Sequence, residues 1–476
     1  MTKPIVWTIA GSDSGGGAGI QADLHTFQAL GAHGCSVITA ITAQNTQQVH
    51  NISPVSLNNI RSQVHALDTD LPATAIKLGM LYTPEIVQAV ADYLKDYNGV
   101  VICDPVMIST SGTELLTPQA KQLLIDHIFP RADLVTPNRM EAELILKNPI
   151  QNHADVEKAA KHILKLGPKS VLIKGGHSSD NTCYDYWTNG HESFWLCSPK
   201  QPTQNTHGSG CTLASAITAC LALGYDIKDA LVIAKMYINQ GIDKSESLGR
   251  GPGHVMPSSW PEKQHYLPKV IHHITSIPHY DFPKCHEIGL YPIIDNIDLL
   301  KKLLSLGIST IQLRIKNKTF NLDDDIKQAI KLAKHYDAKL FINDYWELAI
   351  KHNAYGVHLG QSDIEAADIH KIHAAGLHLG ISTHCYYEVA RAHALNPSYL
   401  ACGPIFPTTT KIMPFKPQGI EGLARWRRTL DYPLVAIGGI DFEKYRSVME
   451  TGVNGVAMIS AISMLTNCSN INSVNI

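Results

Sequence analysis

Residues 205–212 combine a tight turn with residue types that can bind an anion. They read Asn-Thr-His-Gly-Ser-Gly-Cys-Thr and precede an apolar run of helix formers. Gly208, Ser209 and Gly210 can form the turn that opens a helix, so that several backbone N–H groups point the same way at the positive end of its dipole. Cys211 would lie on the first turn, where a thiolate is favoured. The pattern predicts an anion site, although a glycine-containing cap before a core helix fits the same residues.

A second glycine-rich segment, residues 11–19, follows a predicted strand over residues 5–10 and precedes a predicted helix over residues 20–30. This order suggests dinucleotide binding, but the next strand, residues 36–41, is not followed by an acid that could hold a ribose, so NAD is not expected. The glycines still allow a ligand to approach the backbone closely. Asp23, on the helix just behind them, is either a ligand contact or a solvated aspartate.

Further polar side chains follow strands of the first half. Asp104 ends a predicted strand over residues 100–106, and Lys174 ends another over residues 171–176. Because ligands bind at the carboxyl ends of parallel strands, both are candidate site residues. The other predicted elements are a strand over residues 75–81, a hairpin of residues 184–187 and 193–196, and helices after residue 211 and over residues 228–245. Together they predict an open, mostly parallel sheet with helices on both faces.

The second half alternates strands and helices with a shorter period. Its eight predicted strands cover residues 290–295, 310–316, 339–344, 356–359, 379–383, 399–405, 434–438 and 455–460. Eight such repeats in under two hundred residues predict a TIM-type (β/α)8 barrel. Gln312, Arg314 and Lys316 are two apart on one strand, so all three should point into the barrel. Two cations and an amide there make little sense as core, and an anionic ligand would explain them.

Composition excludes several classes of protein. The 476 residues carry 40 Lys and Arg against 42 Asp and Glu, so no basic field indicates nucleic acid or membrane. The 10 cysteines show neither zinc spacing nor a disulfide pattern, and the start has no signal-peptide architecture. We therefore expect a cytoplasmic enzyme.

A proline-rich segment separates the two halves. We expect domains over residues 1–262 and 288–476, joined by a linker over residues 263–287. Residues 268–277 are too apolar for a solvated tether. They are predicted to begin a short helix at Pro268. These residues, or a subunit partner, are expected to pack over the barrel near its eighth and first strands; the alternative is that the segment caps the amino-terminal end of the barrel.

The motifs of the first half, taken together and in order from Pro4 to about Trp260, resemble the hydroxymethylpyrimidine and phosphohydroxymethylpyrimidine kinase family. The resemblance implies a ribokinase-like fold and two ATP-dependent phosphorylations, first to the pyrimidine monophosphate and then to the diphosphate. It implies a pyrimidine pocket of Gly11, Asp23, Gln44, Met80 and Val106. It implies an ATP side of Asp104, Asn138, Glu141 and Lys174, and catalysis by Gly208, Ser209, Gly210 and Cys211. Either Cys211 takes the proton of the acceptor hydroxyl, or it only packs the helix start while the amides act.

The second half, from about Gly289 to Ser463, resembles thiamine-phosphate synthase. The resemblance implies that the pyrimidine diphosphate is joined to a thiazole phosphate, with release of diphosphate. It implies a pyrimidine diphosphate site of Gln312, Arg314, Lys316, Asn343, His358, Ser382 and Lys411. Asp344 and Asp363 would bind Mg²⁺. The thiazole phosphate site would consist of Thr408, Thr410, Gly438, Gly439, Ile459 and Ser460.

The chain departs from this resemblance in one element that matters. The helix expected after the eighth strand is nearly absent, because only three residues separate Ser463 from a polar tail over residues 467–476. The sequence therefore leaves undecided whether the barrel closes. Other interpretations are a pyridoxal-type kinase, which phosphorylates once, and a vitamin-sensing protein without activity. The expected partners are small molecules, with a homo-oligomer possible.

Overall fold

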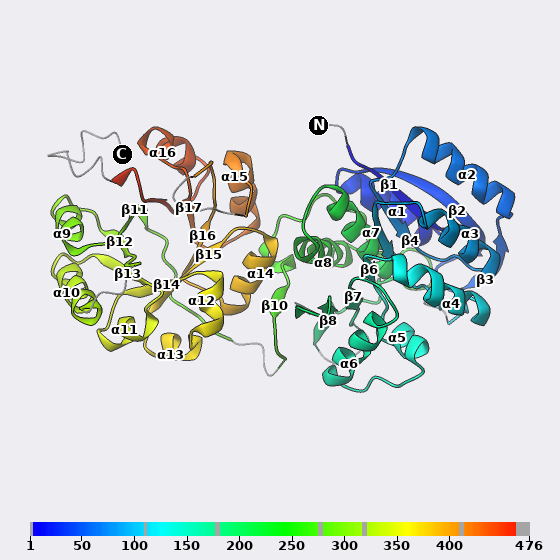
Figure 1. The fold of residues 1–476 in the computed structure, drawn as a ribbon, viewed down its shortest axis with the longest axis horizontal. Helices are drawn as coiled ribbons and strands as arrows, with labels where there is room; N and C mark the ends of the chain where they lie inside the picture. Colours follow the sequence, from blue (N-terminus) through cyan, green and yellow to red (C-terminus); the bar gives the residue numbers. More distant parts are fainter. Residues whose placement is uncertain are drawn as a thin grey trace. The chain divides into compact units, whose positions relative to one another are not determined.

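The computed structural model describes residues 3–108, 112–176, 181–274, 279–316, 321–408 and 414–462. Contacts divide the chain into two compact units, residues 1–261 with 265–276, and residues 262–264 with 277–476. In Figure 1 the first unit runs from blue to green and the second from yellow-green to red. Each unit has a sheet and a core of its own.

The first unit is built on a ten-stranded sheet with the order β10-β9-β8-β7-β6-β5-β4-β1-β2-β3. The strands from β7 to β2 in this order run parallel, whereas β3, β8, β9 and β10 are antiparallel to their neighbours. The predicted open, mostly parallel sheet is confirmed. The strands are β1 Ile5–Asp13, β2 His33–Gln44, β3 Val49–Pro54, β4 Ala75–Leu78, β5 Val100–Cys103, β6 Leu134–Val135, β7 Val171–Ile173, β8 Thr182–Thr188, β9 Ser193–Pro199 and β10 Lys269–Ile271.

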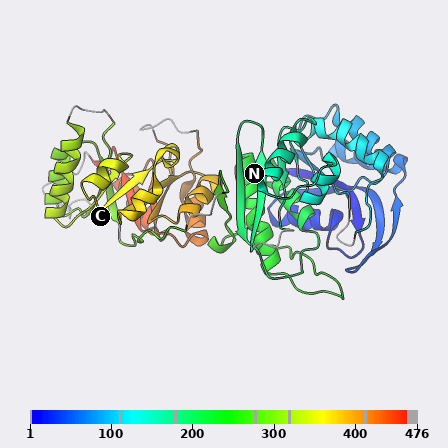
Figure 2. The same ribbon diagram turned by 90° about the horizontal axis from the view of Figure 1, so that it is seen from below.

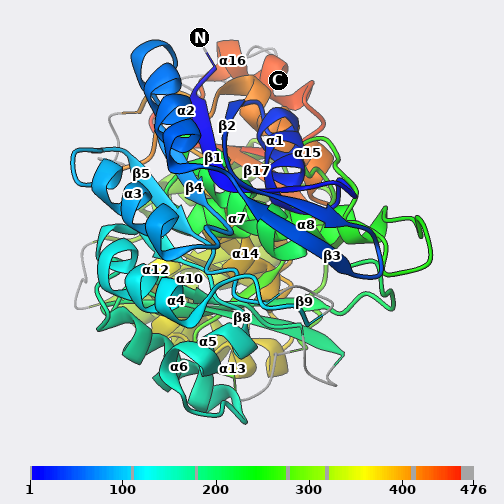
Figure 3. The same ribbon diagram turned by 90° about the vertical axis from the view of Figure 1, so that its right-hand side faces the viewer.

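Helices cover both faces of this sheet. In Figure 3, α2 and α3 lie on one side, and α1 and α7 on the other. The central strand β4 is buried along its whole length, as expected for a parallel strand between two helical layers. The helices are α1 Gly19–Ala29, α2 Leu57–Asp70, α3 Pro84–Leu94, α4 Pro118–Leu123, α5 Arg139–Leu146, α6 His153–Leu164, α7 Ser209–Ala222 and α8 Ile227–Asp243.

The second unit is a closed, all-parallel barrel of eight strands. The predicted TIM-type barrel is confirmed, because β18 pairs with β11 and places Gly289 opposite Gly455. Its strands are β11 Gly289–Ile294, β12 Thr310–Leu313, β13 Lys339–Asn343, β14 Gly356–Leu359, β15 His378–Thr383, β16 Tyr399–Cys402, β17 Leu434–Ile437 and β18 Gly455–Met458. The end of the chain after residue 462 lies outside the described residues, so the expected lack of a last helix is not tested.

Helices surround the strands of the barrel, as the yellow-green to orange ribbons of Figure 2 show. They are α9 Ile297–Ser305, α10 Leu322–His335, α11 Trp346–Lys351, α12 Gln361–Ala366, α13 Ile369–Ala374, α14 Tyr386–Leu395, α15 Gly419–Thr429 and α16 Phe442–Met449. Helix α9 illustrates their construction. Asn296 caps its first turn, and its buried residues, Leu300, Leu303 and Leu304, are spaced to line one face toward the core.

The prediction for residues 268–277 is wrong where the structure describes them. Lys269–Ile271 form the edge strand β10, antiparallel to β9, instead of a helix over the barrel. Val270 and Ile271 are buried there, which accounts for the apolar character of the segment.

The following segment caps the amino-terminal end of the barrel. Cys285 and Ile288 belong to the barrel core, together with Tyr291 and Phe341. The backbone N–H of Cys285 donates to Ser398 O just before β16, at the amino-terminal end of the strands. Residues 268–277 were considered as a cap for the amino-terminal end of the barrel, and Cys285 and Ile288 occupy that place instead.

Candidate active sites

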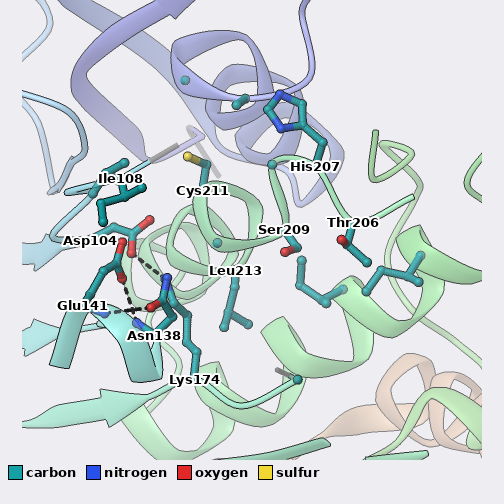
Figure 4. A pocket seen from close by; sticks show the side chains of 18 of the residues that line it. Asp104, Ile108, Asn138, Glu141, Lys174, Thr206, His207, Ser209, Cys211 and Leu213 are labelled. Carbon is teal, nitrogen blue, oxygen red and sulfur yellow. Dashed lines mark hydrogen bonds and ion pairs between the residues drawn. The ribbon is translucent and has the colours of Figure 1, made fainter. Parts of the chain in front are cut away.

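A cavity of about 580 Å³ opens at the carboxyl ends of the parallel strands of the first unit. The loop after β1, the turn before α7 and the ends of β5 and β7 all contribute to its wall, part of which Figure 4 shows. Of the residues predicted for this half, the cavity wall includes Gly11, Gln44, Met80, Val106, Asp104, Asn138, Glu141, Lys174, Gly208, Ser209, Gly210 and Cys211. Sequence motifs far apart in the chain thus meet in one site.

The turn before α7 has the geometry that the glycines suggested. Gly208 has a φ of 79°, in the left-handed region, and its carbonyl accepts the first helical hydrogen bond, from Thr212 N at 2.9 Å. A Cβ atom on Gly208 would lie 1.8 Å from Gly17 O, so no side chain fits there. Ser209 N donates to Thr206 O at 3.1 Å, and the N–H groups that follow it lie at the positive end of α7 in the cavity wall, where an anion can bind.

Cys211 lies on this first turn, but its thiol is not activated as expected. Burial raises the pKa of Cys211 to about 11, Asp23 and Asp104 act in the same direction, and Lys77 opposes them. Lys77 and a backbone hydrogen bond from Gly19 therefore do not outweigh burial. The expectation that a thiolate is favoured is wrong for the protein without ligands, because the group remains a thiol at neutral pH.

Four polar residues lie together at the other side of the cavity as two hydrogen-bonded pairs (Figure 4). Lys174 Nζ donates to Asp104 Oδ1 at 2.7 Å. Asn138 and Glu141 cap α5 reciprocally, with Asn138 N donating to Glu141 Oε2 at 2.7 Å. Burial raises the pKa of Glu141 to about 7, against the effect of Lys174 and with that of Asp104. Lys174 Nζ would be 3.0 Å from a Cβ on Gly210, so the cation lies next to the anion-binding turn.

The expectation that Asp23 lines the pyrimidine pocket is wrong, because its side chain lies behind the cavity wall. It is fully buried and accepts hydrogen bonds from Thr8 Oγ1 at 2.6 Å, Ser215 Oγ at 2.6 Å and Lys77 Nζ at 2.8 Å. These donors occupy both carboxylate oxygens. Asp23 therefore holds Lys77, and it is Lys77 that reaches the cavity.

Lys77, Asp13 and His207 also line this cavity, and the sequence did not single them out. Lys77 lies inside a buried strand, where a charged residue reads as an exception to the pattern. Asp13 and His207 lie inside the two glycine-rich motifs, but no spacing rule links them. Their presence in the motifs was the only available signal.

In the barrel, Gln312, His358 and Ser382 belong to one chain of hydrogen bonds. Gln312 Nε2 donates to Tyr291 OH at 3.2 Å, and Tyr291 OH is 2.8 Å from Tyr399 OH. His358 Nδ1 is 2.7 Å from Tyr399 OH, and its Nε2 is 2.8 Å from Ser382 Oγ. Burial, together with the charge of Arg314, lowers the pKa of His358 to about 3, so the imidazole is neutral. The two tyrosines were missed because both fit a buried strand.

Asp344 and Asp363 face each other where β13 and β14 end. Asp363 lies in the first turn of α12, and its Oδ2 accepts from Gly360 N at 3.1 Å. Asp344 is exposed when the whole residue is considered, but protein atoms still surround part of its carboxyl group. That burial and the carboxylate of Asp363 raise its pKa to about 6, while Arg314 lowers it. Two close carboxylates in this state fit a divalent cation, which would relieve their repulsion.

Of Gln312, Arg314 and Lys316, which were predicted to point into the barrel, the first two lie toward its site, since the charge of Arg314 acts on both His358 and Asp344. Strand β12 ends at Leu313, and Gln312 is buried inside the barrel. Arg314 is half-buried beyond the strand, and Lys316 is exposed. Asn343, by contrast, is buried at the end of β13.

The predicted thiazole phosphate residues follow β16, β17 and β18. Gly438 and Gly439 have φ values of 98° and 66° and pack against residues 404–407 so closely that a Cβ on either would clash. Thr408 follows that segment, and Ile459 and Ser460 are exposed after β18. Thr410 and Lys411 lie outside the described residues.

The described residues contain neither a cluster of three potential metal ligands nor a membrane-spanning helix. No group of three or more His, Cys, Asp or Glu side chains converges as a metal site within the described ranges. None of the helices described has the length and apolar character needed to cross a membrane.

Comparison with known proteins separates the same two halves. The family model of phosphomethylpyrimidine kinase matches residues 13–256, and that of thiamine monophosphate synthase matches residues 290–462. A probable thiamine biosynthetic bifunctional enzyme of Oryza sativa, named as chloroplastic, is 36% identical over 97% of this chain and 86% of its own length. A hydroxymethylpyrimidine/phosphomethylpyrimidine kinase of Synechococcus elongatus is 45% identical over 53% of this chain and 97% of its own length.

Among solved structures, the pyridoxal kinase of Staphylococcus aureus in complex with AMP-PCP and pyridoxal is similar to the first unit. It is 31% identical, the TM-score is 0.53, and the match covers 57% of this chain and 99% of the kinase. The similarity of the first unit to a solved kinase thus agrees with the kinase family model that matches residues 13–256.

Proposed function

Since this chain belongs to the family of bifunctional thiamine biosynthetic enzymes, we propose that the cavity of the first unit and the strand ends of the barrel are its two active sites. The chain is a hydroxymethylpyrimidine and phosphomethylpyrimidine kinase with ATP as phosphate donor, and a thiamine-phosphate synthase. We assign the kinase to residues 1–262 and the synthase to residues 288–476. Of the segment between them, β10 completes the kinase sheet and Cys285 packs in the barrel core.

In the kinase, the pyrimidine would lie on Gly11, Gln44, Met80 and Val106. Met80 and Val106 offer apolar surface, and Gln44 offers a hydrogen-bonding side chain in the same cavity. ATP would lie toward Asp104, Asn138, Glu141 and Lys174. In the first transfer the hydroxyl oxygen of the substrate attacks the γ-phosphorus, the bond to ADP breaks, and the hydroxyl proton passes to a base. In the second transfer a phosphate oxygen of the monophosphate attacks, and again the bond to ADP breaks.

The turn from Gly208 to Cys211 would stabilise the transferring phosphoryl group. Its backbone N–H groups and the nearby Lys174 place positive charge where negative charge spreads over the phosphoryl oxygens. Cys211 is our candidate for the group that takes the hydroxyl proton. A thiol must lose its own proton before it can take another, and burial raises the pKa of Cys211 to about 11, so Cys211 acts as the base only if the bound substrates favour its thiolate. The amides act whether or not Cys211 ionises.

In the synthase, the pyrimidine diphosphate would contact Gln312, Arg314, Lys316, Asn343, His358, Ser382 and Lys411. Asp344 and Asp363 would hold Mg²⁺, which neutralises charge on the leaving diphosphate. Neutral His358 is bonded to Tyr399 and Ser382, so it can orient the ring without adding a charge. Thr408, Thr410, Gly438, Gly439, Ile459 and Ser460 would bind the thiazole phosphate, where barrels commonly bind phosphate.

Two finer proposals concern the setting. None of the nine described cysteines forms a disulfide, which suits a reducing compartment such as the cytoplasm. The partners are small-molecule substrates rather than nucleic acid or membrane, and a homo-oligomer is compatible with the chain.

The observation that carries the kinase assignment is the convergence of both glycine-rich motifs, Asp104 and Lys174 on one cavity. We test it with Cys211→Ala in the full chain. If Cys211 takes the proton, formation of the pyrimidine diphosphate should fall at least a hundredfold, while the variant still couples supplied pyrimidine diphosphate to thiazole phosphate. Kinase turnover near that of the wild type would remove the role of Cys211 and leave catalysis to the amides.

A further inference from the structure

His207 lies between the loop that follows β1 and the side chain of Gln44. Its Nε2 atom is 3.4 Å from Asp13 Oδ2 and 3.3 Å from Gln44 Nε2. The side chain is only 12% exposed, and Figure 4 shows it well apart from Lys174. One ring nitrogen therefore faces a carboxylate and a carboxamide inside the cavity.

Asp13 is an acceptor whose position is fixed by the backbone. Its Oδ1 accepts from Gly15 N at 2.8 Å, and its Oδ2 accepts from Gly17 N at 3.1 Å and Ala18 N at 2.9 Å. Burial acts to raise the pKa of Asp13, but the hydrogen bonds from His207 and the backbone outweigh it and hold the pKa below its usual value. Asp13 is therefore ionised at neutral pH and can only accept hydrogen bonds.

Hydrogen bonds hold the main chain of His207 on both sides, which places its ring next to this carboxylate. His207 N donates to Gly253 O at 3.2 Å, and Val255 N donates to His207 O at 3.2 Å. Next to it, the backbone of Gly208 touches that of Gly17. The backbone that carries the ring therefore cannot move away from Asp13 and Gln44 unless both loops move.

These contacts decide which end of the Gln44 carboxamide faces His207. Because an ionised carboxylate faces Nε2, the ring carries a proton on that atom. A carboxamide amino group would then oppose another donor, whereas its oxygen can share the Nε2 proton. A half-turn about the last bond of the side chain exchanges the two ends without other movement.

We propose that His207, oriented by Asp13, is a positioning residue that holds the Gln44 oxygen and turns the Gln44 amino group toward the substrate. The inference rests on the proposed function, which places the pyrimidine on Gln44. An amino group in that position donates and does not accept. The kinase would therefore recognise an unprotonated ring nitrogen and reject a ring with a C–H group in its place.

The test uses the purified full chain and three substrates, hydroxymethylpyrimidine and its two pyridine analogues in which one or the other ring nitrogen is replaced by C–H. The wild type should use one of the two analogues roughly tenfold to a hundredfold less efficiently in kcat/KM, mainly through KM, because the Gln44 amino group is left unpaired. In His207→Phe, which keeps a ring but no donor, this discrimination should fall below about threefold while kcat changes little.

His65→Phe, at an exposed position of α2, is the matched control and should keep the discrimination of the wild type. If His207→Phe does not fold, Asp13→Asn serves instead, because an amide there no longer dictates which ring nitrogen carries the proton. Unchanged discrimination in the folded variant overturns the proposal, and so does equal use of all three substrates by the wild type. A wild type that phosphorylates none of them contradicts the proposed function instead.

Discussion

Asp344 connects protonation of the barrel with the proposed magnesium site. In the folded chain its pKa is raised from 3.8 to about 6, so the folded state binds the proton more tightly than the unfolded state. Without metal, this group therefore makes the barrel less stable as pH rises from about 4 to about 6. Mg²⁺ needs the ionised carboxylate, so its affinity should change in the opposite direction.

We expect the Mg²⁺ concentration for half-maximal coupling to fall roughly fivefold as pH rises from 5 to 6 and to level off above about 7. Asp344→Asn should raise the Mg²⁺ requirement at neutral pH and remove most of this pH dependence, without affecting the kinase. The measurement is coupling of supplied pyrimidine diphosphate against Mg²⁺ concentration. Asp298→Asn is the control, because that side chain is 95% exposed. The same Mg²⁺ curve in Asp344→Asn and wild type would refute the metal assignment.

The residue types of the site were predictable where a motif carried them, but their contacts were not. Cys211 and Lys174 were named from local patterns and line the predicted cavity. Asp13 and Asp23 are both aspartates beside one glycine-rich loop, yet only Asp13 reaches the cavity. The difference depends on Lys77, Thr8 and Ser215, which the fold brings to Asp23 from distant elements, and sequence spacing does not encode that meeting.

Among the elements, the turn before α7 depends on glycine more than any helix position does. At Gly208 a side chain would meet both a positive φ and the backbone of Gly17. Gly224, just after the same helix, has a φ of 88° with nothing within 4 Å of its Cβ position. The two glycines therefore separate backbone strain from steric contact.

Gly208→Ala should reduce the kinase kcat at least a hundredfold, because the loop and the anion-binding turn must separate to admit the methyl group. Gly224→Ala should cost only about 1 kcal/mol of stability from backbone strain and leave the kinase near wild type. Steady-state kinetics and thermal unfolding of both variants check this. Equal kinase rates in the two variants would contradict the close contact of Gly208 with Gly17.

Strand β10 shows how far the edge of the kinase sheet extends along the chain. Val270→Ser with Ile271→Ser should destabilise the first unit by roughly 3 kcal/mol or more, because both side chains are buried against it. Hydrogen exchange of the full chain should show lost protection in β9 and unchanged protection in the barrel strands. Loss confined to the barrel would restore the position that the sequence suggested.

Most elements were predictable because their hydrophobic runs are long and end in glycine or polar residues. The strand over residues 356–359 was predicted with its observed ends, and the hairpin of β8 and β9 was also found. The strand β10 was missed because two apolar residues shortly after a proline fit a helix or a strand equally well. Pairing with β9 decides in favour of a strand, and β9 lies about seventy residues earlier in the chain.

At the scale of the whole molecule, the two units carry consecutive steps. The kinase product, a pyrimidine with a diphosphate on its methylene group, is the substrate from which the synthase displaces diphosphate. One chain should therefore convert hydroxymethylpyrimidine to thiamine phosphate with two ATP consumed for each product. This stoichiometry distinguishes the account from a pyridoxal-type kinase, which transfers one phosphate.

A single incubation of the purified chain with hydroxymethylpyrimidine, ATP, Mg²⁺ and thiazole phosphate tests this claim most directly. Thiamine phosphate, diphosphate and ADP are followed over time. The account predicts that thiamine phosphate and diphosphate appear in equal amounts, with two ADP for each, and that omission of thiazole phosphate leaves the pyrimidine diphosphate as the end product. Accumulation of the pyrimidine monophosphate with one ADP, and no thiamine phosphate, would contradict it.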